Sequence, residues 1–437
     1  MASTYIKRTC DGAYTSIFTW SAWVKRSATG SYHGLFCNKK NDSNSNSRVR
    51  FYFSDADRLA MEVKDSTSGD DSFFQTNRLF RDVNAWYHIV LAYDTTESAE
   101  NDRIKLWVNN EEITSWEQFN RASSNFGTLW SSAMEHRIGT QNANSGTNYY
   151  FDGSMSHVHL TYGTAYTPSA FGETDSTTGE WKIKTSPSVT YGSQGYFVLK
   201  DGNSLTDQSG QSNNFTVGAG TLTKTEDNPS NVFATLNPLS TKSITSRGNT
   251  TAEYGSSSNT YETTTTTLGM TSGKYYCECK ITIDQALPAI GISATNANAS
   301  NTLGSEWLGA SSDTYGYWIN GTIYNNGSSI ASGQSTFATN DIMGMALDLD
   351  STQNTLKYYK NGSLVSTVNV TTNSNGWLFG TTHETGKSGA RSKFNFGNGY
   401  FEETAVSSAG TNASENGIFE YDVPTGYTAL STKGLNL

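Results

Sequence analysis

Apolar and polar residues alternate along this chain in short stretches with a period of two. These stretches are rich in Val, Ile, Thr, Tyr, Phe and Trp, and Asn-Gly, Asp-Gly and Ser-Gly turn signals separate them. Apolar residues at the helical period of 3.6 are almost absent. Short strands with frequent turns are typical of antiparallel sandwiches. The pattern therefore predicts an all-β fold built from two antiparallel jelly-roll β-sandwiches in tandem.

The predicted strands form two groups, separated by a stretch without strand pattern. The first group lies at 18–25, 49–53, 59–63, 88–93, 104–108, 136–138 and 151–160. The second group lies at 274–283, 289–293, 315–319, 342–348, 355–359, 363–370 and 392–396. We assign the first group to a domain at 1–198 and the second to a domain at 241–405.

One arrangement occurs in both groups. Residues 88–93 and 342–348 are continuous apolar runs, typical of strands buried on both faces. Each run is followed by a polar turn and then by a tight hairpin, at Asn109-Asn110 in one group and at Asn361-Gly362 in the other. Asn-Gly is the strongest hairpin signal because both residues tolerate positive φ. The repeated arrangement predicts two sandwiches of the same general type.

Two further segments follow neither strand group. Residues 199–240 are predicted to be an ordered connector, because Pro229 and Pro238 stiffen it and its apolar residues favour packing on a domain. Residues 406–437 are a C-terminal tail. Its polar and aromatic end, from about Glu415, is expected to dock against the second sandwich.

Composition narrows the classes of partner. The hydrophobic fraction of 35% is sufficient for real cores, and the net charge of −10 without any basic run argues against a nucleic-acid partner. No run approaches the roughly 20 apolar residues of a membrane helix, and the first residues lack the apolar core of a secretory signal. We expect no membrane insertion. The four cysteines are expected to be free thiols.

Two known module types are recognisable in the chain. The first region resembles laminin-G-like, concanavalin A-like modules, on the stretches Phe18-Thr-Trp-Ser-Ala-Trp-Val24, Trp86-Tyr-His-Ile-Val-Leu91, Ile104-Lys-Leu-Trp-Val-Asn109 and Phe151-Asp-Gly-Ser-Met-Ser-His-Val158. The second region resembles SPRY modules, on Gly273-Lys-Tyr-Tyr-Cys-Glu278, Ile290-Gly-Ile292, Tyr315-Gly-Tyr317, Asp341-Ile-Met-Gly-Met-Ala-Leu-Asp348, Tyr358-Tyr-Lys-Asn-Gly362 and Phe394-Asn-Phe-Gly397. Both resemblances imply β-sandwich binding modules.

A third resemblance concerns the biological setting. Three stretches are similar to structural proteins of tailed phages of aquatic bacteria: 163–175, 228–238 and 426–432. This resemblance implies a virion protein made in the host cytoplasm, which would need no signal peptide. It would act as a tail fibre, head fibre or capsid decoration. Its expected partners are other virion proteins and a host surface glycan, and it is expected to form a homo-oligomer or a multi-copy array.

Catalytic chemistry finds little support in the sequence. Glycosidases of the concanavalin-like fold use two carboxylates, but Glu173-Thr-Asp175 is followed by Glu180 out of register. Asp348 runs into a turn, where an Asp caps backbone donors. We assign no catalytic residue and expect a protein that is not an enzyme. A glycan hydrolase and a free lectin-like carbohydrate-binding protein remain the alternatives.

Two places in the sequence carry side chains of the types that bind metals. The pair His157 and His159 is expected to lie on the solvent face of a strand. The laminin-G resemblance raises calcium as an alternative cofactor, because acidic loops supply the oxygen ligands that this hard cation prefers. These loops contain Asp55, Asp57, Asp70 and Asp71. They show no matched ligand set, so no metal or other cofactor is assigned.

Aromatic residues on loops are the candidates for glycan binding, because their ring faces can stack on sugars. The candidates are Trp116, Trp130, Tyr149 and Tyr150 in the first domain, and Trp307, Tyr315, Tyr317 and Tyr324 in the second. The alternative for each is a place in the core or in a cross-strand pair. We expect that alternative for Trp20, Trp23, Trp86 and Trp107.

Overall fold

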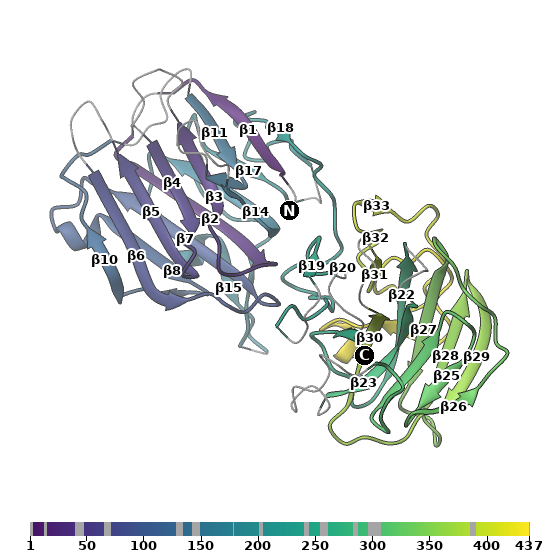
Figure 1. Cartoon of the computed structure of the whole chain (residues 1–437). Helices are drawn as coiled ribbons and strands as arrows, with labels where there is room; N and C mark the ends of the chain where they lie inside the picture. The colour runs from purple at the N-terminus through teal and green to yellow at the C-terminus, as the bar shows by residue number, and fades with distance from the viewer. Residues whose placement is uncertain are drawn as a thin grey trace. The chain divides into compact units, whose positions relative to one another are not determined.

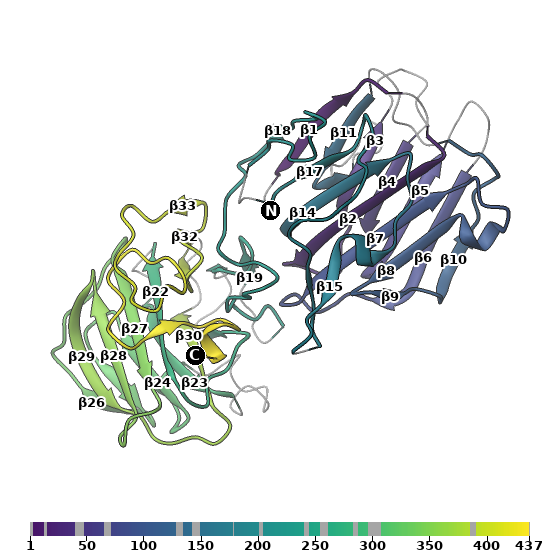
Figure 2. The same ribbon diagram turned by 180° about the vertical axis from the view of Figure 1, so that it is seen from behind.

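The chain forms two compact all-β units, Met1–Lys224 and Thr225–Leu437 (Figures 1 and 2). The computed structural model describes residues 3–12, 15–39, 48–64, 71–127, 134–141, 149–177, 179–200, 204–239, 244–253, 261–282, 287–295, 307–384 and 390–436. The predicted fold class is confirmed: nearly all strand pairs are antiparallel, and each unit stacks two large sheets. No helix in the described ranges is long and apolar enough to cross a membrane.

The first unit is a sandwich of an eight-stranded and a six-stranded sheet. The eight-stranded sheet has the order β10 (Trp116–Asn120), β6 (Asp71–Leu79), β5 (Arg58–Lys64), β4 (Arg48–Phe53), β3 (His33–Lys39), β11 (Met134–Ile138), β1 (Tyr5–Cys10) and β18 (Thr216–Ala219). The six-stranded sheet has the order β17 (Tyr196–Val198), β14 (Gly153–Tyr162), β2 (Ile17–Arg26), β7 (Trp86–Asp94), β8 (Ile104–Val108) and β9 (Glu111–Glu112).

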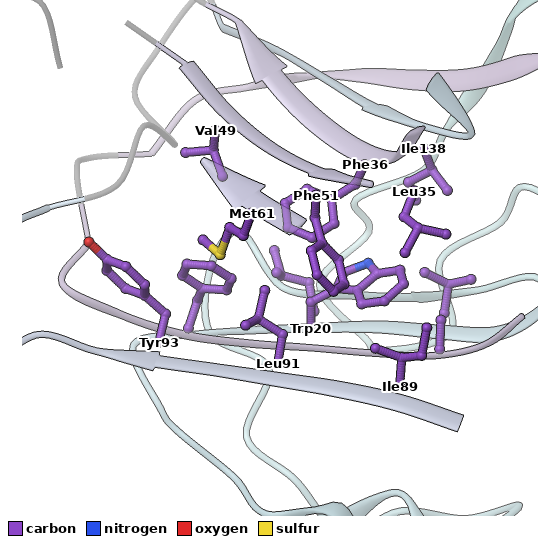
Figure 3. Packing of buried hydrophobic residues seen from close by; sticks show 14 of the residues in the cluster. Trp20, Leu35, Phe36, Val49, Phe51, Met61, Ile89, Leu91, Tyr93 and Ile138 are labelled. Carbon is purple, nitrogen blue, oxygen red and sulfur yellow. The ribbon is translucent and has the colours of Figure 1, made fainter. Parts of the chain in front are cut away.

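The core of the first unit lies between these two sheets. Figure 3 shows Phe51 and Phe36 of the eight-stranded sheet reaching toward Trp20 and Leu91 of the six-stranded sheet. The Trp20 ring lies 5.4 Å from Phe36 and 5.5 Å from Phe51, and all three are fully buried. Aromatic pairs in such tilted and edge-on contacts contribute beyond the area that they bury.

A short outer layer covers part of the six-stranded sheet of the first unit. It contains the 3-10 turn η2 (Pro168–Ala170) and the hairpin β15 (Gly172–Thr174) with β16 (Trp181–Ile183) (Figure 2). Phe171 of this layer packs on Val90, Ala92 and Trp107 of the sheet. The outer face of this sheet is therefore partly occupied by the protein itself. A further 3-10 turn, η1 (Glu100–Asp102), precedes β8.

The second unit has the same two-layer plan. Its larger sheet has the order β19 (Ile244–Ser246), β20 (Thr251–Glu253), β31 (Arg391–Asn395), β22 (Lys274–Ile281), β27 (Ile342–Asp348), β28 (Thr355–Lys360) and β29 (Ser363–Asn369). The second sheet has the order β21 (Tyr261–Thr265), β30 (Trp377–Glu384), β23 (Ala289–Ala294), β24 (Thr314–Trp318), β25 (Ile323–Asn325) and β26 (Ser328–Ala331). A small hairpin joins β32 (Tyr400–Phe401) to β33 (Thr404–Ala405).

The tail of the chain lies on the larger sheet of the second unit. Its strand β34 (Thr428–Ala429) pairs in parallel with β22, and the 3-10 turn η4 (Gly434–Asn436) follows. Tail residues Phe419, Val423 and Tyr427 pack with Phe233 against Tyr276 of the sheet. The tail and part of the expected connector thus form a third layer on this sheet.

The expected connector is divided between the two units. Leu199 and Phe215 join the core of the first unit, and β18 pairs with β1 there. Ala234 and Leu236 join the core of the second unit. The observed division therefore falls between 224 and 225, because the apolar residues on each side complete a different core.

Every predicted strand overlaps an observed one, and several observed strands have no counterpart in the prediction. The unpredicted strands include β1, β3, β6, β21 and β30. β6 and β21 are rich in polar residues, so that their apolar alternation is weak. Tertiary pairing with β5 and β30 makes them strands nevertheless.

Candidate functional site

A short hairpin brings two of the predicted aromatic residues to the surface of the first unit. β12 (Thr140–Gln141) pairs with β13 (Tyr149–Tyr150) beside the eight-stranded sheet. The hairpin approaches the backbone of β3 so closely that a Cβ atom on Gly34 would lie 1.9 Å from the amide nitrogen of Gln141. Glycine is therefore required at this position for the hairpin to reach the sheet.

Four tyrosines form what we call the tyrosine surface: Tyr5, Tyr32, Tyr149 and Tyr150. Tyr149 is 37% exposed, and its ring centroid lies 5.0 Å from that of Tyr32. Tyr150 is half-buried and stacks on Tyr5, with the centroids 6.2 Å apart and the planes at 27°. Tyr52 lies buried beneath Tyr32. The partners of Tyr149 and Tyr150 come from segments that lie far away in the sequence.

Charged groups lie directly beside the tyrosine surface. The Arg137 guanidinium lies 4.9 Å from the centroid of the Tyr5 ring, and the Arg50 guanidinium lies 5.4 Å from that of Tyr52. Burial and the neighbouring Asp55 carboxylate, which the Tyr32 hydroxyl contacts, raise the pKa of Tyr32. Ring faces bordered by a few oriented polar groups are the usual composition of a small-molecule binding surface.

Two other candidates in the first domain do not belong to this surface. Trp116 is half-buried at the edge of the core, edge-on to Phe74 at 5.1 Å and stacked on Phe119 at 4.9 Å. Trp130 lies outside the described residues. The contacts of Trp116 favour the structural alternative for that residue.

Burial excludes two of the candidate glycan-binding residues in the second domain. Tyr315 is 3% exposed and Tyr317 is fully buried, and both belong to the core between the sheets. Alternate residues of a strand point to opposite faces, and in β24 these two point inward. The Tyr317 hydroxyl donates to the Ser335 carbonyl oxygen at 2.5 Å. Neither residue is available to an external ligand.

The remaining candidates, Trp307 and Tyr324, belong to an aromatic cluster that also contains Tyr261 and Trp318. Trp307 meets Tyr324 at 89° and Trp318 at 74°, with centroids 5.3 and 5.4 Å apart. In such edge-to-face contacts, one ring covers the face of the next. Trp318 is only 8% exposed. The cluster therefore offers less open ring face than the tyrosine surface does.

The acidic pair considered for catalysis is neutralised. Glu173 lies on β15 and Asp175 directly follows it, and the Lys182 amine lies 3.8 Å and 2.9 Å from their carboxylates. Asp348 accepts hydrogen bonds from the backbone amides of Asp350 and Ser351 at 3.0 Å each, so it caps a turn as predicted. Both sets of carboxylates thus have structural partners.

A buried Ser–His pair, which was not predicted, has the geometry of a dyad but the wrong proton arrangement. The Ser21 hydroxyl lies 2.9 Å from Nε2 of His88, and the Trp181 indole N–H donates to Nδ1 of His88 at 2.9 Å. An indole nitrogen only donates, so Nδ1 is an acceptor and the ring proton is on Nε2. Burial lowers the pKa of His88 to about 3. Nε2 therefore has no lone pair to take the serine proton.

Basic side chains of the protein pair with acidic residues of the loops that could have bound calcium. Asp57 binds Arg26 at 2.9 Å and Arg81 at 3.2 Å, and Asp71 lies 4.0 Å from Lys64. Asp70 lies outside the described residues. Within the described ranges, no group of three or more His, Cys, Asp or Glu side chains could hold a metal ion.

The expectation for the histidine pair is wrong in one respect. His159 is 2% exposed, stacks on Phe197 at 3.9 Å and contacts the Tyr191 hydroxyl at 3.0 Å, so it does not face solvent. The outer layer of the first unit covers it, which the strand pattern did not indicate. The four cysteines form no disulfide bond, as predicted, and the structure shows that all four are buried.

Comparison with known families agrees with both resemblances. Residues 2–170 match the family model of the concanavalin A-like lectin/glucanases superfamily, and residues 274–399 match that of the SPRY domain. The chain therefore contains a concanavalin A-like domain followed by a SPRY domain. A search of the curated proteins finds no match.

Similar solved structures have low sequence identity to the chain. A human SPRY domain is 18% identical and covers 33% of this chain and 90% of its own, with a TM-score of 0.29. The SPRY domain of human HERC1 is 18% identical and covers 36% and 96%, with a TM-score of 0.31. A heptameric SAP-like pentraxin from Limulus polyphemus is 13% identical and covers 51% and 91%, with a TM-score of 0.30. Likenesses this distant do not bear on function.

Proposed function

We propose that this protein is a non-enzymatic structural component of a phage virion, and that its first domain binds a host surface glycan through the tyrosine surface. Within the virion it would serve as a tail fibre, head fibre or capsid decoration. The main support for glycan binding is the exposure of the Tyr149 ring beside Tyr32, with Tyr150 and Tyr5 next to them. The support for the virion setting is the resemblance of 163–175, 228–238 and 426–432 to phage structural proteins.

The geometry suits weak binding that is repeated many times. A tyrosine face contributes apolar contact to one side of a sugar ring, and its hydroxyl remains available for hydrogen bonds. One such contact is weak, but many copies on a symmetric particle gain strength through avidity. Other virion proteins are the expected partners for anchoring.

The virion assignment is tested by mass spectrometry of purified particles. We expect this protein at several copies per particle. Its presence in infected-cell lysate but not in purified particles would contradict the assignment and favour a free lectin-like protein. Release of reducing sugar from a host polysaccharide would favour a hydrolase instead.

Glycan binding is tested on a glycan array with the full chain. Tyr149→Ala together with Tyr150→Ala should abolish the signal, because the exposed ring of Tyr149 and the half-buried ring of Tyr150 are both lost. Trp307→Ala is the matched control, since it removes a ring from the aromatic cluster of the second unit. Loss of binding in the control, but not in the double variant, would move the site to the second unit.

A further inference from the structure

The outer face of the eight-stranded sheet carries two clusters of charge. In one, Lys7 of β1 and Arg137 of β11 share the carboxylate of Glu135, with Lys7 at 2.9 Å. In the other, Arg48 and Arg50 of β4 share the carboxylate of Glu62, with Arg48 at 2.7 Å. In each cluster, two cations contact the same carboxylate. Four cations thus gather on these neighbouring strands, although the chain as a whole carries −10.

The register of the sheet fixes the spacing of the two clusters. Lys7 is paired with Arg137, Arg137 with Cys37, and Cys37 with Arg50. Arg137 and Arg50 are thus two strand spacings apart, about 9.5 Å across the sheet. The short side chain of Cys37 separates them. A ligand that bridges both clusters must present negative groups at a comparable spacing.

The cations are held in place before any ligand arrives. The Arg137 and Arg50 side chains are 18% and 21% exposed, so they are half-buried but reachable. Each guanidinium is oriented by a carboxylate on one side and by a tyrosine ring on the other, Tyr5 for Arg137 and Tyr52 for Arg50. Side chains that are already ordered lose little entropy on binding.

The charge clusters and the tyrosine surface are continuous. Tyr5 belongs to the tyrosine surface and to the Arg137 contact, and Tyr52 joins Arg50 to Tyr32. A ligand lying across this face would meet tyrosine side chains and cations in turn. That combination fits a sugar polymer with anionic substituents better than a neutral sugar.

We infer that the ligand of this face is an acidic glycan, whose sugar rings lie on the tyrosine surface and whose carboxylate or sulfate groups bind at Arg137 with Lys7 and at Arg50 with Arg48. This inference rests on the proposed glycan-binding function and specifies its ligand class. A nucleic acid is disfavoured because its backbone carries a charge about every 1.7 Å of duplex and needs many clustered cations.

The test compares two ligands with the same sugar backbone, one charged and one neutral. Binding of an oligogalacturonate and of its fully methyl-esterified, neutral form is measured by titration calorimetry with the full chain. We expect the acidic oligomer to bind, the ester to bind at least about tenfold more weakly, and added salt to weaken only the former. Equal binding of both would overturn the charge assignment while leaving glycan binding intact.

A double variant locates the site. Arg50→Gln with Arg137→Gln leaves one cation for each carboxylate, so the sheet keeps an ion pair in each cluster, and acidic-oligomer binding should fall about tenfold. Lys105→Gln, on the six-stranded sheet, is the matched control and should bind normally. Unchanged binding in a double variant with a normal melting temperature would overturn the site. Binding of a DNA oligomer, or of no oligomer tested, would overturn the ligand class, whereas particle mass spectrometry tests the virion assignment separately.

Discussion

The turn asparagines Asn109 and Asn361 each join a hairpin to the neighbouring buried strand. Both have left-handed backbone angles, with φ of 51° and 48°. The side-chain oxygen of Asn109 accepts from the His88 amide at 2.8 Å, and that of Asn361 accepts from the Ile342 amide at 2.9 Å. The backbone N–H of Asn109 also donates to the His88 carbonyl oxygen, and that of Asn361 donates to the Ile342 carbonyl oxygen, each at 2.8 Å. The same side chain therefore permits the turn and satisfies a strand amide.

Substitution can separate the two roles of Asn109, which are to permit the turn and to bind a strand amide. Asn109→Gly keeps the left-handed turn but loses the bond to the His88 amide, so the first unit should lose about 1 kcal/mol of unfolding free energy. Asn110→Gly, at φ 68°, loses no such bond and should change stability by less than about 0.5 kcal/mol. Urea unfolding of both variants measures the difference. Equal effects would show that only the backbone angle matters.

Gly362 is constrained both by its backbone angle and by a neighbour. Its φ is +81°, and a Cβ atom there would lie 2.7 Å from Cδ1 of Tyr421 in the tail. Gly362→Val should therefore destabilise the second unit by about 2–3 kcal/mol.

The Asn326-Gly327 turn supplies the control for Gly362. Gly327 has φ +68°, but a Cβ atom added at Gly327 would lie 3.7 Å from the nearest atom of another residue. Gly327→Val should cost only the backbone strain, about 1 kcal/mol. Thermal melting compares the two variants, and an equal loss in both would rule out the Tyr421 contact.

At the scale of elements, the tail is fixed to β22 through a buried carboxylate. Glu278 is fully buried and accepts the backbone N–H groups of Glu420 and Tyr421, each at 2.9 Å. Asn395 and the Tyr276 hydroxyl also donate to it, at 3.3 Å each. Burial raises the pKa of Glu278 to about 7, although these hydrogen bonds oppose the rise. The stability of the attached tail should therefore change as Glu278 gains or loses a proton.

The stability of the second unit should vary with pH because of Glu278. An unfolded glutamate has a pKa of about 4.3, so between that pH and about 7 the folded state binds more protons. The stability contributed by this group is complete below the unfolded pKa and is lost as pH rises through about 7, by about 3 kcal/mol.

The variant Glu278→Gln isolates this effect from other titrations. Its amide cannot ionise, so its melting temperature should fall less than that of the natural protein between pH 5 and 8. It will be less stable overall, because an amide N–H₂ replaces one acceptor oxygen. Parallel pH curves for the two proteins would exclude Glu278 as the titrating group.

At the scale of the whole molecule, the boundary of the first unit lies farther along the chain than the strand pattern suggested. A fragment of residues 1–224 keeps β18 and Phe215, whereas one of residues 1–198 loses both. Phe215 is 4% exposed in the core, and loss of a buried Phe costs about 3–5 kcal/mol. The shorter fragment should melt at a clearly lower temperature in calorimetry. Equal melting temperatures would mean that 199–224 adds nothing to the first unit.

The sequence by itself determined the fold class and the main strands. A period of two and the Asn109 and Asn361 turn signals are local properties, since strand and turn preferences act between neighbouring residues. The recurrence of one strand-turn-hairpin arrangement also predicted two sandwiches. Those predictions needed no knowledge of long-range contacts.

Only the tertiary structure decided which candidate residues share a site. Burial excluded Tyr315 and Tyr317 from the candidate ligand-binding residues. The face to which a strand residue points depends on how the sheets stack. Tyr5, Tyr32, Tyr149 and Tyr150 meet through a hairpin placed on β3. The cations of the eight-stranded sheet come from strands separated in the sequence by up to about 130 residues, so no basic run announces them. Register across a sheet, which no local pattern encodes, brings them together.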